Sequence, residues 1–216
     1  MKQSLIDITP KMGVRTPVYP GDPPFVVRLT ASVAAGDPAD VSAVSFSAHC
    51  GAHVDAPAHL FPGTGDAASL PLERFVGPCL VIDLTELAPS ELVRPQTIAA
   101  VKALMGGKAL PSRVLIKTRR SQPPVWSSDF RALSPECVEA FLAEGVELVG
   151  VDVPSIDPAD SEELLAHRIA LSRGLTVMEN LDLSAVMAGS YELIALPLPL
   201  EGVEASPVRA VLRSIP

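Results

Sequence analysis

Residues 134–151 read Ser-Pro-Glu-Cys-Val-Glu-Ala-Phe-Leu-Ala-Glu-Gly-Val-Glu-Leu-Val-Gly-Val, and they predict a helix followed directly by a buried strand. Ser134 and Pro135 are typical of the N-cap and the first helical position, and Gly145 is typical of the residue that ends a helix. The short apolar run at 147–151 is the pattern of a strand that is covered on both faces of a sheet. A helix that leads into such a strand is the repeating unit of an α/β sheet.

The same alternation extends to both sides of this unit. Further strands are expected at 79–84, 113–118, 175–178, 191–196 and 208–212, and further helices at 95–105 and 161–173. The capping-box spacing of Asp160 to Glu163 marks the start of the helix at 161–173, and Gly174 marks its end. Residues 25–33 alternate loosely as a strand, after a turn at 19–24. The sequence therefore predicts an α/β fold, a single domain over residues 1–216 with a mixed sheet and an N-terminal β section.

The composition of the 216 residues excludes several classes of protein. Asp and Glu number 25 against 17 Lys and Arg, a net charge of -8, so we expect no nucleic-acid partner. No apolar run approaches the roughly 18 residues that a membrane helix needs, and the N-terminus shows no signal-peptide core. Cys50, Cys79 and Cys137 are too widely spaced for a disulfide framework. We therefore expect a cytoplasmic protein with no membrane contact.

Three of the four histidines lie within eleven residues of one another. Unbroken alternation over residues 45–55 predicts a strand with His49, His53 and Asp55 on one face. His59 follows a proline that ends this strand, so its ring can fold back to the same side. Two imidazoles and a carboxylate suit Zn²⁺ or another divalent transition metal, and they leave a position open for water. A solvated polar strand face is the alternative, but the clustering of these residues favours a metal.

The fourth histidine, His167, lies in the predicted helix at 161–173, and Glu179 follows the strand at 175–178. These two side chains could meet at the C-terminal edge of the sheet, where α/β sites usually form. His167 shares a helix face with leucines, so a core histidine is an equal alternative. Arg119 and Arg120 end the strand at 113–118. They are either solvated surface or a partner for a substrate carboxylate.

Residues 49–59, His-Cys-Gly-Ala-His-Val-Asp-Ala-Pro-Ala-His, resemble the H-x-G-[TA]-H-x-D-x-P-x-H signature of the metal-dependent cyclase-like hydrolase family. Segments at 6–8, 17–22, 150–157 and 191–198 are also similar to the family. Ala52 and the ending at 205–210 are similar to its kynurenine formamidase branch; isatin hydrolases form another branch. The resemblance implies a swivelling β/β/α fold and a homo-oligomer, most often a homodimer, in which N-terminal segments help form the subunit contact.

The resemblance also implies a site with two zinc ions per subunit, with Mn²⁺ as a possible substitute. His49, His53 and Asp55 would hold one ion. Asp55 would bridge to the second ion, which His167 and Glu179 would also hold. His59 would act as the acid/base, and Tyr19 is a candidate for stacking on the substrate.

The expected reaction is cleavage of N-formyl-L-kynurenine to L-kynurenine and formate, a step of tryptophan degradation. Metal-bound hydroxide would attack the formyl carbon, and His59 would protonate the leaving arylamine. Two other functions remain open. One is hydrolysis of a cyclic amide such as isatin on the same two-metal site. The other is non-catalytic metal binding, which would have no need of His59.

Overall fold

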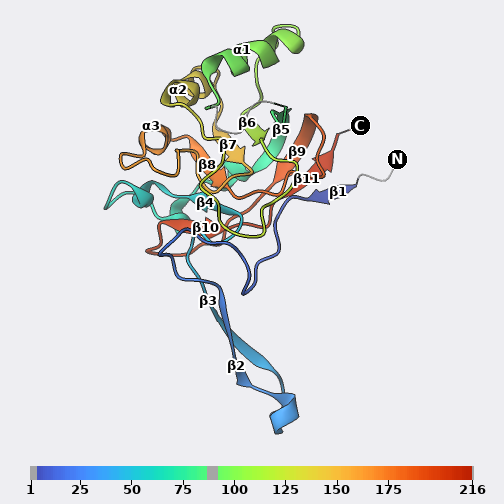
Figure 1. The fold of residues 1–216 in the computed structure, drawn as a ribbon, viewed down its shortest axis with the longest axis vertical. Coiled ribbons are helices and arrows are strands. Elements are labelled where there is room, and N and C mark those ends of the chain that lie inside the picture. The colour runs from blue at the N-terminus through green and yellow to red at the C-terminus, as the bar shows by residue number, and fades with distance from the viewer. Residues whose placement is uncertain (1–3, 87–91, 216) are drawn as a thin grey trace.

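The computed structural model describes residues 4–86 and 92–215, and its centre is a curled, mixed nine-stranded sheet (Figure 1). The strand order is β1-β11-β9-β5-β6-β7-β8-β4-β10. The central strands β5 to β8 run parallel, and the flanking strands pair antiparallel. The strands of this sheet are β1 (Leu5–Asp7), β4 (His53–Asp55), β5 (Val76–Asp83), β6 (Arg113–Lys117), β7 (Leu148–Val151), β8 (Thr176–Glu179), β9 (Gly189–Ile194), β10 (Ala205–Pro207) and β11 (Val211–Ser214).

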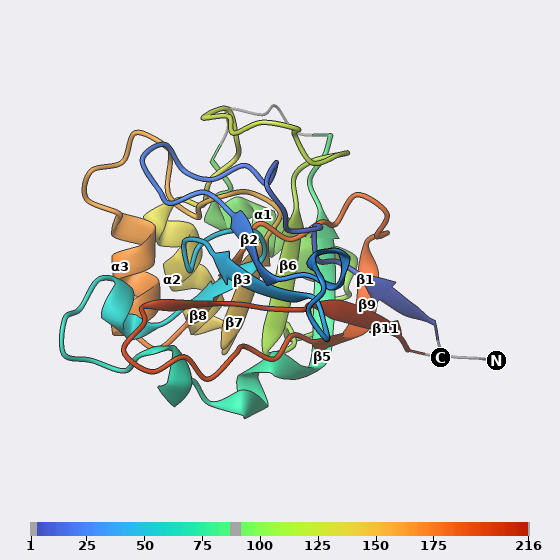
Figure 2. The ribbon, with the colours of Figure 1, turned by 90° about the horizontal axis from the view of Figure 1, so that it is seen from below.

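In the described part of the chain, three α-helices cover one face of the sheet (Figures 1 and 2). They are α1 (Pro95–Leu104), α2 (Pro135–Ala143) and α3 (Leu165–Ser172); short 3-10 helices lie at η1 (Val33–Ala35), η2 (Pro57–His59), η3 (Ala67–Ser69) and η4 (Leu72–Phe75). Successive side chains of a strand point to opposite faces. Val114 and Ile116 of β6 therefore pack with the helices, together with Phe141 of α2. Leu115 packs in a second core on the other face. The predicted α/β fold with a mixed sheet is confirmed.

The remaining two strands form an arm that projects from the rest of the molecule (Figure 1). The strands β2 (Val26–Ala31) and β3 (Val41–Ser45) pair antiparallel with each other and with no other strand in the described part of the chain. The 3-10 helix η1 forms the tip. Nearly all side chains of the arm are exposed, because no second layer covers either of its faces.

The start of α3 differs from the prediction. The helix begins at Leu165, because the carboxylate of Asp157 accepts the N–H groups of Ala166 and His167. The hydroxyl oxygen of Ser161 accepts the N–H of Leu164 instead, which closes a separate turn ahead of the helix. The strand predicted at 208–212 is likewise observed later in the chain, as β11.

The single strand predicted over residues 45–55 is wrong. The strand β3 ends at Ser45 and β4 begins at His53, and turns occupy the residues between them. Gly51 has a φ of +72°, a left-handed conformation that departs from the extended backbone of a strand. A Cβ atom at this position would lie 2.8 Å from Cγ of Met12, so glycine is also required by close packing. His49 therefore lies on a turn and not on a strand.

Candidate metal centre

Two antiparallel strands bring three of the predicted ligands to one face of the sheet. In the pairing of β4 with β8, His53 lies opposite Glu179 and Asp55 lies opposite Val177. Val177 packs in the core under the helices, so by alternation His53, Asp55 and Glu179 face the same side. Val54 packs in the opposite core. The three residues are at most 3% exposed, which is unusual for charged groups unless they are paired.

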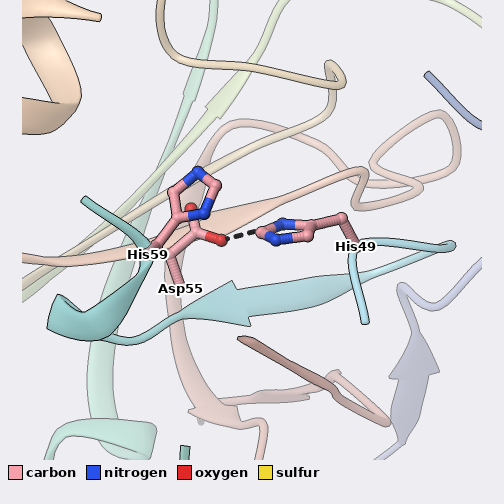
Figure 3. A group of neighbouring side chains, drawn as sticks. All are labelled: His49, Asp55 and His59. Carbon is pink, nitrogen blue, oxygen red and sulfur yellow. Dashed lines mark ion pairs between the residues drawn. The ribbon is translucent and has the colours of Figure 1, made fainter. Parts of the chain in front are cut away.

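His49 and His59 reach this cluster from outside the sheet. His49 comes from the turn that follows the arm, and its Nδ1 lies 3.2 Å from Oδ1 of Asp55 (Figure 3). Pro57 begins the 3-10 helix η2, which ends the strand and turns His59 back toward the cluster. The ring centroids of His49 and His59 are 4.5 Å apart. The three histidines that lie close together in the sequence thus converge in space, although only His53 lies on a strand.

His167 completes the cluster from α3. Its Nε2 lies 3.1 Å from Oε1 of Glu179 and 3.4 Å from Oδ2 of Asp55. The helix and β8 therefore meet at the C-terminal edge of the sheet, as the sequence suggested. His167 is buried, but its ring nitrogen faces carboxylates and not the apolar core.

The donor set fits a divalent cation. His53 Nε2 and both carboxylate oxygens of Asp55 are buried and have no hydrogen-bond partner. Unpaired buried polar atoms are costly, and a cation among them would remove that cost. Nδ1 of His53 lies 2.9 Å from the carbonyl oxygen of Gly51, an arrangement in which Nδ1 donates and Nε2 keeps a lone pair for the cation. Imidazole and carboxylate ligands together suit zinc and similar transition metals.

Two groups of ligand atoms are compact enough to hold an ion. One is His53, Asp55 and Glu179, and the other is His49, Asp55 and His59; within each group the ligand atoms lie within 4.8 Å of one another. Asp55 belongs to both groups, which agrees with a bridging position. Both groups differ from the sequence-based assignment: the first joins His53 to Glu179, and the second includes His59 as a ligand.

Charges and burial set the protonation of this cluster. Burial alone raises the pKa of Asp55, but the nearby imidazoles of His167, His49 and His53 outweigh it, so the pKa lies well below its usual range. Burial lowers the pKa of His59, and the neighbouring His49 and His167 lower it further against the opposing effect of Asp55 and Glu179. His59 is therefore a neutral imidazole at pH 7, which can accept a proton.

A cavity of about 610 Å³ opens above the cluster, and its walls are partly aromatic. Tyr19 and Trp126 meet there edge to face, with ring centroids 5.6 Å apart, and Phe130 also lines the cavity. Of these residues, Tyr19 was expected from the sequence, whereas Trp126 and Phe130 were not. Both lie outside regular elements, and the only signal was that Trp126 is the single tryptophan of the chain.

A smaller cavity of about 110 Å³ adjoins the first and shares Tyr19, Trp126 and His49 with it. Arg119 lines this second cavity. Arg120 lines neither cavity; it pairs with Glu86, and its side chain is 73% exposed. The structure thus brings Arg119 to the site and leaves Arg120 on the surface.

Comparison with known proteins shows which family the chain belongs to. A family model described as "Putative cyclase" matches residues 6–158. The chain belongs to the cyclase family. The kynurenine formamidase of Bordetella avium (strain 197N) is 42% identical to it over 212 residues, which are 98% of each chain. The family resemblance predicted from residues 49–59 is therefore confirmed.

Solved structures show the same fold as this cyclase-family chain. One, described as a potential metal-dependent hydrolase with cyclase activity, is 26% identical with a TM-score of 0.83 and covers 99% of both chains. An isatin hydrolase bound to the product analogue thioisatinate has a TM-score of 0.87 at 20% identity, covering 100% of this chain and 94% of its own. In the described part of the chain, every helix is too short or too polar to cross a membrane.

Proposed function

We propose that the protein is a kynurenine formamidase, a hydrolase that cleaves N-formyl-L-kynurenine to L-kynurenine and formate. The observation that carries this proposal is the buried cluster of His, Asp and Glu side chains at the floor of an aromatic-walled cavity. The 42% identity to a curated kynurenine formamidase over nearly the whole chain supports the same substrate. The likeness to isatin hydrolase at 20% identity supports the fold alone.

We propose that the site holds two zinc ions, which Mn²⁺ could replace. His49, His53 and Asp55 would hold one ion, and Asp55, His167 and Glu179 the other. When bound, the ions supply a nucleophile at neutral pH and polarise the formyl oxygen. The buried carboxylates Asp55 and Glu179 offset the positive charge, and the low exposure of the cluster strengthens each of these interactions.

The chain's own groups move the proton and position the substrate. The neutral ring of His59 would take a proton from the attacking water and deliver it to the nitrogen of the leaving arylamine. Tyr19 and Trp126 offer ring faces and edges against the aryl group of the substrate. Arg119, in the adjoining cavity, would receive the α-carboxylate.

The proposal is tested by giving purified, zinc-loaded protein N-formyl-L-kynurenine and isatin in parallel assays. We expect kcat/KM for N-formyl-L-kynurenine to exceed that for isatin. The reverse order would favour the cyclic-amide alternative. Absence of turnover with both substrates, while two metals per chain are bound, would contradict the proposed substrate class and favour metal binding without catalysis.

Arg119→Gln should raise KM for N-formyl-L-kynurenine by about 10- to 100-fold, because a charge-assisted hydrogen bond to the substrate is lost. The same variant should leave KM for N-formylaniline unchanged, because that formamide has no carboxylate. Arg120→Gln removes the same charge one residue away, on the surface, and should change neither KM. Equal effects of the two substitutions on KM in steady-state assays would show that Arg119 does not bind the substrate carboxylate.

We also propose that the protein is a homodimer that uses the arm of β2 and β3 as part of its interface. Val27 pairs with Val44 and Leu29 pairs with Ser42, so these four side chains share one face of the ribbon. The three apolar side chains among them are each about half exposed, at 49%, 54% and 55%. An apolar face on a projecting ribbon is typical of a surface that a second copy covers.

The double substitution Val27→Lys with Val44→Glu should convert the dimer to a monomer, as measured by light scattering after size-exclusion chromatography. Opposite charges on directly paired positions keep the ribbon itself paired. Arg28→Glu with Ala43→Lys places a similar charge pair on the opposite face and should leave the dimer intact. A wild-type protein that elutes as a monomer would contradict the proposed dimer.

We propose that the protein works in the cytoplasm. Its three cysteines are buried and unpaired, which suits a reducing compartment.

A further inference from the structure

The carboxylate of Asp157 contacts His167 at Nδ1, whereas Nε2 of the same ring faces the cluster carboxylates. Its Oδ2 lies 2.7 Å from Nδ1 of His167. Asp157 is 2% exposed and belongs to neither of the compact ligand groups. It lies between β7 and α3, in a stretch without regular secondary structure. The carboxylate of Asp157 has no role in the proposed reaction.

The contacts of Asp157 decide which ring nitrogen of His167 carries the proton. Oδ1 accepts the backbone N–H of Ala166 at 2.9 Å, and Oδ2 accepts the backbone N–H of His167 at 2.9 Å. Because both carboxylate oxygens act as acceptors, the short contact between Oδ2 and Nδ1 of His167 is a hydrogen bond that Nδ1 donates. In the neutral ring, Nε2 is then the nitrogen left to bind a cation. It faces the carboxylates of Asp55 and Glu179, at 3.4 Å and 3.1 Å.

The carboxylate of Asp157 also fixes the position of the His167 ring. The residue before α3, Leu164, has a φ of +50° and makes no side-chain cap, so the first N–H groups of the helix depend on Asp157. His167 lies in the first turn of this helix. One side chain therefore sets both the start of the helix and the orientation of the ring that the helix carries.

We infer that Asp157 is the positioning residue of the second metal site: it holds His167 with Nδ1 protonated and Nε2 directed at Asp55 and Glu179. Outer carboxylates of this kind orient ligand histidines and raise their basicity. The inference rests on the proposed metal centre and does not depend on the identity of the substrate. Asp157 touches neither the cluster carboxylates nor the cavity, so its effect must pass through His167.

Asp157→Asn is the sharpest test. The amide keeps the size of the side chain and one acceptor oxygen for the helix N–H groups, but it places an N–H donor where Nδ1 needs an acceptor. We expect one of the two zinc ions to bind about 10- to 100-fold more weakly, while the other keeps its affinity. Titration against a competing chelator measures this difference. In the zinc-loaded wild type, ¹⁵N shifts of His167 should show Nδ1 protonated and Nε2 coordinated, and the variant should lose that pattern.

Asp152→Asn is the matched control. Asp152 is equally buried, lies five residues away and accepts backbone N–H groups of Thr118 and Arg119, but none of its hydrogen bonds involves a histidine. This control should bind both ions as the wild type does. Asp157→Ser keeps a hydroxyl acceptor for the helix and serves as a second variant if the amide disturbs folding.

Two tightly bound ions and unchanged His167 shifts in the Asp157 variants would overturn the positioning role. The outcome is separable from the proposed function. A wild-type protein that cleaves no formamide, yet loses affinity for one ion on Asp157→Asn, would contradict the substrate and support the role of Asp157.

Discussion

Asp55→Asn should remove both metal ions and lower kcat/KM for the formamide by more than about 10³-fold, because the source of a neutral-pH nucleophile is lost. Oδ1 of Asp55 faces Nδ1 of His49 at 3.2 Å and Nε2 of His53 at 3.6 Å. Oδ2 faces Nε2 of His167 at 3.4 Å. An asparagine has the same shape but offers one neutral oxygen, and so it cannot bridge two cations.

Thermal unfolding with and without chelator measures this loss independently of activity. An ion that binds only the folded protein raises its stability in proportion to the logarithm of ion concentration over Kd. The wild type should therefore unfold at a lower temperature in chelator, whereas the Asp55→Asn protein should not respond. A variant that keeps two ions by elemental analysis and responds to chelator as the wild type does would contradict the bridging position.

Glu204→Gln provides the control for a simple loss of negative charge. Its Oε1 lies 3.5 Å from Nε2 of His49, the ring nitrogen that Asp55 does not face, and its side chain is 45% exposed. An exposed carboxylate contributes little to holding a buried cation. Both ions should stay bound to this variant, so a parallel loss of metal would indicate a general charge effect.

The part of the site that lies on strands could be predicted from sequence. Alternation placed His53 and Asp55 on one face, and the structure has them so in β4, opposite Glu179 of β8. The meeting of His167 with Glu179 at the C-terminal edge of the sheet was one of two equal interpretations, beside a core histidine. These relations depend on short-range periodicity, which the sequence carries directly.

The parts of the site that lie on loops could not be predicted in this way. The alternation of residues 45–55 continues through Gly51, but the backbone there is left-handed and lies against the side chain of Met12, far away in the chain. Trp126 reaches the cavity from a segment without periodicity. Asp157 replaces the predicted helix cap from nine residues before Ala166, a separation outside the spacing of local caps. Local spacing and periodicity signal none of these three positions.

His59→Ala should keep both ions and lower kcat by about 10²- to 10⁴-fold, the range for loss of a general acid/base. The neutral ring lines the main cavity, 4.5 Å from the ring of His49 and 5.9 Å from that of His167, measured between centroids. It is close enough to the cluster to exchange a proton with the reacting atoms. It is also close enough to act as a ligand with His49 and Asp55.

The two roles of His59 predict different dependence on the leaving amine. If His59 protonates that amine, the loss in His59→Ala should shrink for formanilides whose anilines are weakly basic, because such amines leave without full protonation. If His59 holds a metal, the loss should be uniform across the series and elemental analysis should show fewer than two ions per chain. We expect a series of ring-substituted formanilides to show the first pattern. A uniform loss with one ion missing would move His59 from the proton transfer to the ligand set, and the group of His49, Asp55 and His59 would then describe the first metal site.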